Sequence, residues 1–266
     1  MYAFDYERPS AVDAAVALLR SVEEPKVLAG GQTLLPTLKQ RLAQPGTLVD
    51  LARIPGLSAI ERRGEGLSIG AMARHAAVAT SPLVREAIPA LAELAGMIGD
   101  PAVRNRGTLG GSIANNDPTA DYPAACLALG ATIITSARQL AADDFFTGLF
   151  ETALAEDELV LAVEFPLPAR AGYAKFRNPA SRYAMAGVFI AQGADGIRVA
   201  VTGAGQGGVF RWTAAEEALA ADFRVESLAD IALDADDIMS DLHGSADYRT
   251  HLVKIMAKHA MVAALR

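Results

Sequence analysis

Two pairs of adjacent glycines, at residues 30–31 and 110–111, constrain most strongly what this chain can fold into. The first pair follows the short apolar run 26–29 and leads into a segment of helical character that begins at Thr33. Glycine has no Cβ, so it can adopt positive φ and lets a ligand approach the main chain. The N–H groups at the start of a helix attract anions. The sequence therefore favours an anion site here, with an ordinary strand-to-helix turn as the alternative.

The second pair lies within a polar segment, residues 99–117, that combines functional groups of several kinds. The cations Arg104 and Arg106 precede the glycines, and the hydroxyls of Thr108 and Ser112 flank them. Amide and carboxylate side chains follow at 115–117. This mixture offers donors for a pyrophosphate and acceptors for sugar hydroxyls.

A third glycine cluster, residues 203–208, matches the pattern G-x-G-x-x-G and follows an expected strand. A dinucleotide-binding Rossmann unit would need a second parallel strand that ends in an acidic residue about 20 positions further on. The chain runs instead into helical sequence. We therefore interpret this cluster as a crossing between two structural elements.

Composition excludes several classes of function. The net charge of −7 argues against a nucleic-acid partner, which would require clustered Lys and Arg. The single cysteine, Cys126, can form neither an internal disulfide nor an iron–sulfur cluster, and it is expected to be buried in a helix. The four histidines match no metal-ligand pattern, and we interpret them as structural. No apolar run is long enough for a membrane span, and the first residues do not resemble a secretory signal.

Hydrophobic periodicity predicts alternating strands and helices over the first two thirds of the chain. Pro89 should divide the helical stretch 81–98, and the segment 99–121 is expected to be irregular. The expected elements are a helix at 11–20, a strand at 26–29, a helix at 33–42, strands at 47–50 and 67–70, a short helix that ends at Gly130, and strands at 132–134 and 158–165.

Pro166 and Pro168 mark a boundary, beyond which an antiparallel meander is expected at 173–176, 184–192 and 197–202, with a tight turn at 193–196. The rest should be helical. The last helix, 245–265, is expected to dock on a sheet through a stripe of five residues: Tyr248, Leu252, Ile255, His259 and Val262.

Five separated segments, in the same order, carry a resemblance to a known family: residues 4–9, 29–36, 104–111, 117–121 and 241–249. The chain resembles the FAD-binding medium subunits of the xanthine dehydrogenase and carbon monoxide dehydrogenase family of molybdenum hydroxylases. The resemblance covers nearly the whole chain.

The resemblance implies an α+β architecture: a PCMH-type FAD-binding fold of two α/β subdomains, followed by a C-terminal antiparallel sheet with helices. The implied units are 1–55, 56–167 and 168–266, with FAD between the first two. The implied cofactor-binding residues are Ala29, Gly30, Gly31, Gln32, Thr33, Leu34, Leu35, Thr108, Gly110, Gly111, Ser112, Asn115, Asp117, Asp121, Leu159, Lys175 and Tyr183.

Among these residues, Asp121 is expected to bind cofactor hydroxyls, Leu159 to pack against the flavin or the adenine, and Tyr183 to lie near the isoalloxazine ring. A bulky residue in place of Gly110 or Gly111 is expected to abolish flavin retention while the fold stays largely intact.

The function implied is that of a cytoplasmic flavoprotein subunit of an oxidoreductase. A large subunit would carry the molybdenum cofactor, and a small subunit would deliver electrons to FAD through iron–sulfur clusters. The expected assembly is a heterotrimer, commonly dimerised. The chain offers no catalytic motif and no metal site of its own, so it is expected to bind and position its cofactor. The alternative is a stand-alone FAD-dependent oxidoreductase with its own small-molecule substrate.

Overall fold

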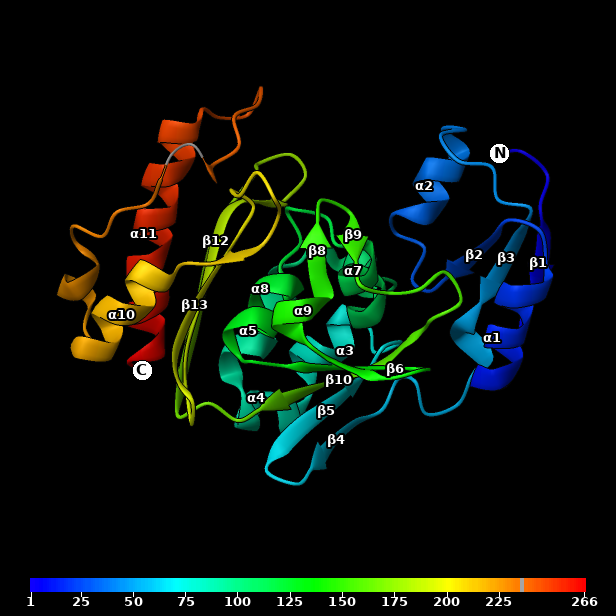
Figure 1. Cartoon of the computed structure of the whole chain (residues 1–266), viewed down its shortest axis with the longest axis horizontal. Coiled ribbons are helices and arrows are strands. Elements are labelled where there is room, and N and C mark those ends of the chain that lie inside the picture. Colours follow the sequence, from blue (N-terminus) through cyan, green and yellow to red (C-terminus); the bar gives the residue numbers. More distant parts are fainter. Residues whose placement is uncertain (235–236) are drawn as a thin grey trace.

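The computed structural model describes residues 1–234 and 237–266, which form three main sheets and a small two-stranded one (Figure 1). The first main sheet has the order β1-β3-β2, with all pairs parallel. Its elements are β1 (Asp5–Glu7), α1 (Val12–Ser21), β2 (Pro25–Leu28), α2 (Leu34–Lys39) and β3 (Thr47–Asp50). The predicted strand at 47–50 is confirmed, whereas α2 is shorter than predicted, and Arg41 beyond it has φ 59°.

The second main sheet is antiparallel and has the order β4-β5-β10-β6-β7. Its strands are β4 (Ile60–Arg63), β5 (Gly66–Gly70), β6 (Thr132–Thr135), β7 (Gln139–Ala141) and β10 (Val160–Pro166). Strand β4 was not predicted, because the sequence IERR is mostly exposed and lacks an apolar alternation. The small sheet pairs β8 (Phe146–Gly148) with β9 (Glu151–Thr152).

Seven helices belong to the same part of the chain. They are α3 (His75–Thr80), α4 (Pro82–Ala87), α5 (Pro89–Met97), α6 (Pro101–Arg104), α7 (Leu109–Asn115), α8 (Tyr122–Ala128) and α9 (Ala142–Phe145). The predicted division at Pro89 is confirmed, since α4 ends and α5 begins there. Cys126 is buried in α8, as expected.

The prediction that residues 99–121 are irregular is wrong, because α6 and α7 lie within this segment. Each helix is held by its cap rather than by apolar periodicity. The Asp100 carboxylate accepts from Val103 N–H at 2.9 Å, and the Thr108 hydroxyl accepts from Gly111 N–H at 3.2 Å. Caps of this kind stabilise helices too short to show a repeating pattern.

The third main sheet is the predicted antiparallel meander, with the order β11-β12-β13-β14. Its strands are β11 (Arg170–Arg177), β12 (Ala184–Gly193), β13 (Gly196–Thr202) and β14 (Phe210–Arg211). The predicted tight turn is confirmed, since Gly193 pairs with Gly196. The glycine cluster at 203–208 connects β13 to β14, and every strand pair of this sheet is antiparallel, unlike in a Rossmann unit.

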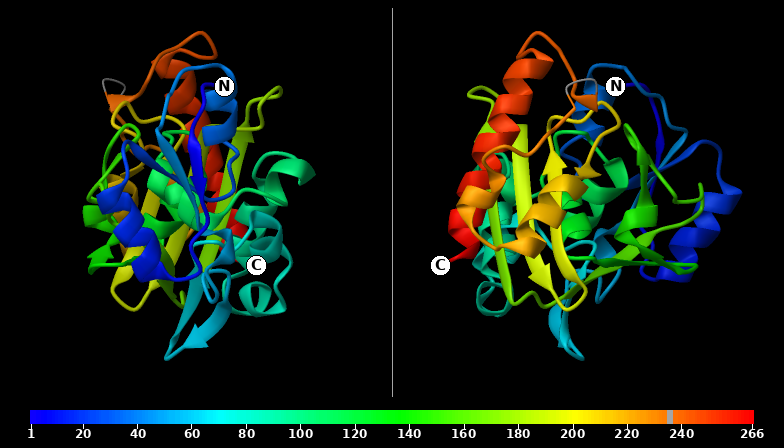
Figure 2. Two further views of the ribbon diagram at one scale, coloured as in Figure 1. Left: turned by 90° about the vertical axis from the view of Figure 1, so that its right-hand side faces the viewer. Right: turned by 60° about the vertical axis from the view of Figure 1, so that its left-hand side comes forward.

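The third sheet is buried on both faces. Tyr173, Phe189 and Ala200 belong to the core of the middle part of the chain, while Val188 and Val199 belong to a second core. That second core lies beneath α10 (Thr213–Ala221) and α11 (Ala246–Ala264), which cover the side of the sheet away from the first sheet (Figure 1, Figure 2). Two short 3-10 helices, Leu51–Arg53 and Val225–Leu228, complete the elements.

The predicted docking stripe of α11 is correct at Leu252 and Ile255, which pack in the second core, and wrong at His259 and Val262, which are exposed. Tyr248 and Val262 are 42% and 44% exposed and His259 is exposed, while Leu252 is buried. The buried side of the helix consists of Arg249, Leu252, Val253, Met256, Ala257, Ala260, Met261 and Ala264. Small residues on this side bring the helix main chain against β11, which the hydrophobic pattern alone does not reveal. A Cβ on Gly172 would lie 2.1 Å from the Ala260 carbonyl oxygen.

One buried histidine lies beneath the second glycine turn. His75 begins α3, is 5% exposed, and packs its ring against that of Tyr122 at 5.4 Å between centroids. Among the described residues its Nδ1 has no hydrogen-bond partner. Burial, aided by the charge of Arg104, lowers the pKa of His75 from 6.5 to about 4. The side chain is therefore neutral in the folded protein near neutral pH.

Replacing Gly172 tests the close contact between α11 and the third sheet. Because a Cβ there would also lie 2.6 Å from Ala264 N, Gly172→Ala should lower the free energy of unfolding, by about 1–3 kcal/mol as for overpacking. Urea unfolding measures the change.

The matched control is Gly96→Ala in α5, where the nearest atom would be 3.9 Å away. It should raise stability by up to about 1 kcal/mol. Equal effects of the two substitutions would refute the close packing.

The second prediction concerns acid stability. A histidine whose pKa is depressed on folding contributes stability above its unfolded pKa of 6.5, and that contribution is lost as the pH falls toward about 4. The full loss amounts to about 3 kcal/mol. In His75→Leu, the free energy of unfolding should therefore fall less steeply over this range than in the parent protein. The control His251→Leu, at an exposed position of α11, should leave the slope unchanged. If the free energy of unfolding of His75→Leu fell with pH as steeply as that of the parent protein, the lowered pKa of His75 would be contradicted.

Candidate functional site

The two glycine turns, residues 29–33 and 106–111, lie far apart in the chain but meet in the structure. A Cβ placed on Gly30 would lie 2.3 Å from the Arg106 carbonyl oxygen and 2.7 Å from Gly107 Cα. A Cβ on Gly111 would lie 3.5 Å from Ala29 Cβ. The main chains of the two turns are thus in direct contact. This is the arrangement that a ligand bound by both turns requires.

The first turn leaves main-chain donors free. It follows β2 and precedes α2, and Gly31 has φ +71°, a conformation that favours glycine. Within the described ranges 1–234 and 237–266, the N–H groups of Gly31, Gln32 and Thr33 donate to no acceptor in the chain. Gln32 and Thr33 are exposed, whereas Leu34 and Leu35 are half-buried. These unpaired N–H groups are suited to bind an anion such as a phosphate.

The second turn uses its donors differently. Leu109 N–H donates to Ala73 O at 3.0 Å, and Gly110 N–H donates to Ala71 O at 2.8 Å. Gly111 N–H donates to the Thr108 hydroxyl, which is itself buried. The N–H groups of Leu109 and Gly110 therefore anchor the second turn to the segment that follows β5, while among the described residues Thr108 N–H has no acceptor.

The contacts of Gly110 overturn one expectation. A Cβ at Gly110 would lie 2.4 Å from Ala71 Cβ and 2.8 Å from Ala71 Cα, so a bulky residue there must displace the main chain. The expectation that such a substitution leaves the fold largely intact is wrong for Gly110. Gly111 has more room, because its close neighbour, at 2.8 Å, is the Thr108 hydroxyl.

Helix α7 carries the polar residues that follow the second turn. Ser112 and Asn115 lie on it and are half-buried. Its C-cap is Asn116, a residue that was not singled out from the sequence and that adopts φ 41°. The Asn116 amide donates to Gly148 O at 2.8 Å and to Glu151 O at 2.9 Å, which ties α7 to the β8–β9 hairpin. Asparagine tolerates positive φ, and this is the signal that could have indicated its role.

Asp117 and Asp121 follow α7 and have different partners. The Asp117 carboxylate accepts from Thr119 N–H at 2.8 Å and from its hydroxyl at 2.6 Å, which forms a local turn. Asp121 precedes α8 and is 4% exposed. Lys175 Nζ on β11 donates to both of its carboxylate oxygens at 2.9 Å, and the Tyr173 hydroxyl donates to Oδ1 at 2.5 Å.

This cluster joins two predicted site residues, Asp121 and Lys175, in a buried ion pair whose side chains are 4% and 1% exposed. Burial raises the pKa of Tyr173 well above its ordinary value, and the Asp121 charge adds to the effect. The three groups tie the third sheet to the start of α8. Such a buried pair is stable only while all its members are present.

Tyr183 lies just before β12 and is 47% exposed. Partial burial raises its pKa, and the charges of Asp117 and Asp121 raise it further. The ring therefore lies within electrostatic reach of the same two carboxylates. It offers an exposed aromatic face beside the polar segment that follows α7, as ring stacking requires.

Leu159 lies elsewhere in the site, at the contact between the first and second sheets. It is 3% exposed and belongs to a hydrophobic cluster with residues of the first part of the chain, including Leu19, Val49 and Leu51. Its N–H donates to the Ser136 hydroxyl at 3.0 Å. Its side chain thus packs in the core between the first sheet and α1.

These residues together suit a dinucleotide such as FAD. The first turn offers unpaired N–H groups for a diphosphate, and the second turn provides a rigid surface directly beside it. Carboxylates and amides suited to hydroxyl groups follow, with an exposed aromatic ring nearby. Over the described part of the chain, no three His, Cys, Asp or Glu side chains gather as a metal site. None of the helices described there is both long and apolar enough to cross a bilayer.

Comparison with known proteins agrees with this chemistry. Residues 2–168 match the family model of the FAD binding domain in molybdopterin dehydrogenase. The medium subunit of nicotine 6-hydroxylase from Paenarthrobacter nicotinovorans is 36% identical, and the match covers 98% of this chain and 97% of that subunit. The medium chain of carbon monoxide dehydrogenase from Hydrogenophaga pseudoflava is 37% identical, over 98% of this chain and 96% of that one.

A solved structure shows the same similarity. It is carbon monoxide dehydrogenase from Hydrogenophaga pseudoflava lacking the Mo-pyranopterin moiety of its molybdenum cofactor, and it aligns with a TM-score of 0.87 at 36% identity. The alignment covers 99% of this chain and 98% of that one. The resemblance and the α+β fold expected from the sequence are confirmed. The chain belongs to the family of FAD-binding medium subunits of molybdenum hydroxylases, its cofactor is FAD, and it is a subunit of an oxidoreductase.

Proposed function

We propose that this chain is the electron-transfer flavoprotein of its complex. Electrons from iron–sulfur clusters on a small partner subunit would pass through it to an external acceptor, while a large subunit carries the molybdenum cofactor. The observation that supports this role most directly is the contact between the two glycine turns, which brings together two distant segments that are suited to a dinucleotide. Bound FAD supplies the redox chemistry, and the residues of the chain bind and orient it.

For the diphosphate, we propose the first turn as the main contact. The N–H groups of Gly31, Gln32 and Thr33 are free to donate to phosphate oxygens. The second turn would limit how far the diphosphate can move, since Leu109 and Gly110 anchor it to the segment that follows β5. The proposed site comprises all the residues expected from the sequence: Ala29, Gly30, Gly31, Gln32, Thr33, Leu34, Leu35, Thr108, Gly110, Gly111, Ser112, Asn115, Asp117, Asp121, Leu159, Lys175 and Tyr183.

Around the rest of the cofactor, the residues of this chain would act as orienting groups. The carboxylate of Asp117 and the amide of Asn115 are proposed to bind hydroxyl groups, and Tyr183 to lie beside the isoalloxazine ring. The buried pair of Asp121 and Lys175 would hold the third sheet against this side of the site. We also propose that the chain divides into units at 1–55, 56–167 and 168–266, since each contains one of the three main sheets.

The partner subunits follow from the same proposal. The relatives are named as medium subunits or medium chains, so each works in an assembly of several subunits. The single cysteine of this sequence is too few for an iron–sulfur cluster, which typically requires about four. The proposed assembly is a heterotrimer that dimerises. Its cytoplasmic location stays a prediction.

Substituting Gly31 tests the first turn. Because alanine is strained at φ +71° and its Cβ would lie 2.9 Å from Leu35 Cδ1, Gly31→Ala should displace the free N–H groups. Loss of one hydrogen bond to a charged group should weaken FAD binding about tenfold or more. Titration of the apoprotein with FAD, followed by flavin fluorescence, measures the dissociation constant.

The matched control is Gly64→Ala in the β4–β5 turn. Gly64 has φ +59° and open space around it, so alanine there introduces similar strain without a neighbouring clash. FAD affinity should be unchanged. If Gly31→Ala binds FAD as tightly as Gly64→Ala does, the diphosphate does not rest on the first turn. If the parent chain shows no flavin absorption after reconstitution, the cofactor assignment itself fails.

Co-purification tests the electron-transfer role. The tagged chain, isolated from its own cells under anaerobic conditions, should carry with it one subunit that contains molybdenum and one that contains iron–sulfur clusters. Metal analysis and mass spectrometry identify both. The complex should reduce its flavin when its substrate is added, and the separated FAD-loaded chain should not. A chain that turns over a substrate without partners would instead be the stand-alone oxidoreductase.

A further inference from the structure

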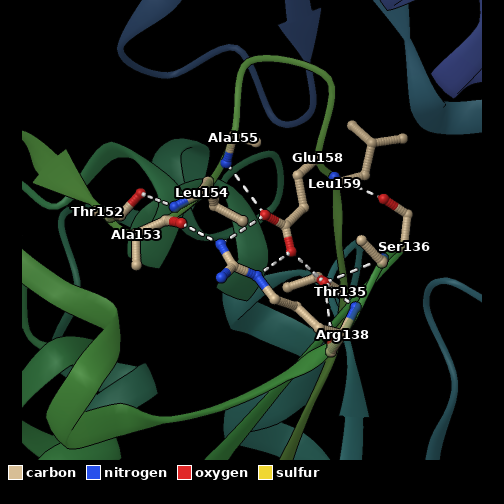
Figure 3. A network of polar contacts seen from close by, with 10 residues as sticks. Thr135, Ser136, Arg138, Thr152, Ala153, Leu154, Ala155, Glu158 and Leu159 are labelled. Atoms are coloured by element: carbon tan, nitrogen blue, oxygen red, sulfur yellow. Dashed lines mark hydrogen bonds and ion pairs between the residues drawn. The ribbon is translucent and has the colours of Figure 1, made fainter.

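A network of polar contacts surrounds Glu158, just before β10 (Figure 3). The Glu158 side chain is 3% exposed. Arg138 donates to it through Nε at 3.1 Å and through Nη2 at 3.0 Å, in a two-pronged ion pair. The Thr135 hydroxyl lies 2.5 Å from Oε1, and Ala155 N–H donates to Oε2 at 3.1 Å. We call these four residues the Glu158 clamp.

The clamp joins two segments beside the point where β6 pairs with β10. Thr135 is the last residue of β6 and Arg138 lies in the turn between β6 and β7, while Ala155 and Glu158 belong to the loop between β9 and β10. Arg138 Nη2 also donates to Ala153 O at 2.6 Å in that loop. Hydrogen bonds from Arg138, followed by those from Thr135 and Ala155 and opposed by burial, lower the pKa of Glu158 to about 2. Its carboxylate is therefore charged at neutral pH, and the clamp is intact.

The residue next to the clamp is Leu159, whose main-chain N–H and carbonyl groups are both hydrogen-bonded to Ser136. Leu159 N–H donates to the Ser136 hydroxyl at 3.0 Å, and Ser136 N–H donates to Leu159 O at 2.8 Å. Its side chain packs in the cluster that includes Val49 and Leu51, at the end of β3. Strand β3 pairs with β2, and β2 leads directly into the first glycine turn. The clamp is thus connected to that turn through packed residues.

We propose that Glu158 is a positioning residue for the FAD site. By fixing Leu159, the clamp would set how the first sheet seats against the second, and hence how the first glycine turn meets the second turn. This inference rests on the proposed function, because it gives the two turns their role in binding FAD. Glu158 itself touches neither the cofactor nor the reacting atoms in this proposal.

The geometry of the turns explains why such positioning matters. At Gly30 the two main chains leave no room for even one added carbon atom, since a Cβ would lie 2.3 Å from Arg106 O. A small shift of the first sheet would therefore move the free N–H groups of Gly31 and Gln32 relative to the second turn. Displacements of this size change binding markedly, because hydrogen bonds weaken steeply with poor geometry.

The decisive experiment compares Glu158→Gln with Glu164→Gln. Glu164 lies on β10, the strand that follows Glu158, and also pairs with an arginine, Arg63 of β4, but this pair is more exposed. The dissociation constant for FAD is measured by fluorescence titration of each apoprotein, and thermal unfolding is followed with and without FAD. Glu158→Gln should raise the dissociation constant roughly tenfold, and Glu164→Gln should change it less than about twofold.

A purely structural role would give a different result. If the clamp only stabilised the fold, Glu158→Gln would lower the unfolding temperatures of the apoprotein and the FAD complex equally, with an unchanged dissociation constant. That outcome overturns the proposal. The expected outcome is a smaller gain in unfolding temperature on addition of FAD than in the parent protein. Failure of the parent protein to bind FAD would instead refute the proposed function.

Three further variants keep the test decisive if Glu158→Gln does not fold. Ser136→Ala removes the hydroxyl that accepts from Leu159 N–H while leaving the clamp itself in place. It should weaken FAD binding in the same direction. Arg138→Lys keeps the charge but loses the two-pronged geometry, and should bind FAD more tightly than Arg138→Gln. Parent-like FAD affinity in both Ser136→Ala and Arg138→Gln would overturn the proposal.

Discussion

The contact of main chain with main chain at Gly30 is the constraint on which the rest of this structure depends. Its neighbours, Arg106 O and Gly107 Cα, are so close that a side chain of any size would separate the two turns. The position of the first sheet relative to the second is therefore closely constrained. The hydrophobic cluster around Leu159 and Val49 and the network at Glu158 lie at that contact. In the proposed site, the packing between sheets and the binding of the cofactor would depend on the same few residues.

The two glycine turns look alike in sequence but use their main-chain N–H groups differently. In the first turn the N–H groups of residues 31–33 are unpaired, as an anion site needs. In the second turn the N–H groups of residues 109–111 donate to Ala73, Ala71 and Thr108. A turn anchored by most of its donors is a firm surface, and a turn with free donors is suited to bind an anion. The third sheet contributes at a distance, because Lys175 and Tyr173 reach Asp121 at the start of α8. Each main sheet thus supports a different side of the proposed site.

Short-range chemistry accounts for the elements that sequence patterns predicted correctly. Pro89 divides one helical stretch into two, and residues 193–196 close a tight hairpin. The patterns failed where a structural element is stabilised by something other than apolar repetition. Helices α6 and α7 depend on the caps Asp100 and Thr108, and the docked side of α11 depends on small residues that admit close backbone contact. For α11, the predicted hydrophobic stripe was therefore right at Leu252 and Ile255 but missed the small residues of the docked side.

The sequence alone determined that the chain has two glycine turns, that it carries one cysteine and a net negative charge, and that its motifs follow the order of a flavoprotein family. These properties depend on residue type and on neighbours in the chain, which the sequence states directly. Only the tertiary structure decided that the turns touch, that Asp121 pairs with Lys175 across 54 positions, and that Asn116 holds the β8–β9 hairpin. Residues so far apart in the chain show no repeating pattern that would indicate their contact. These contacts form only when the sheets pack together.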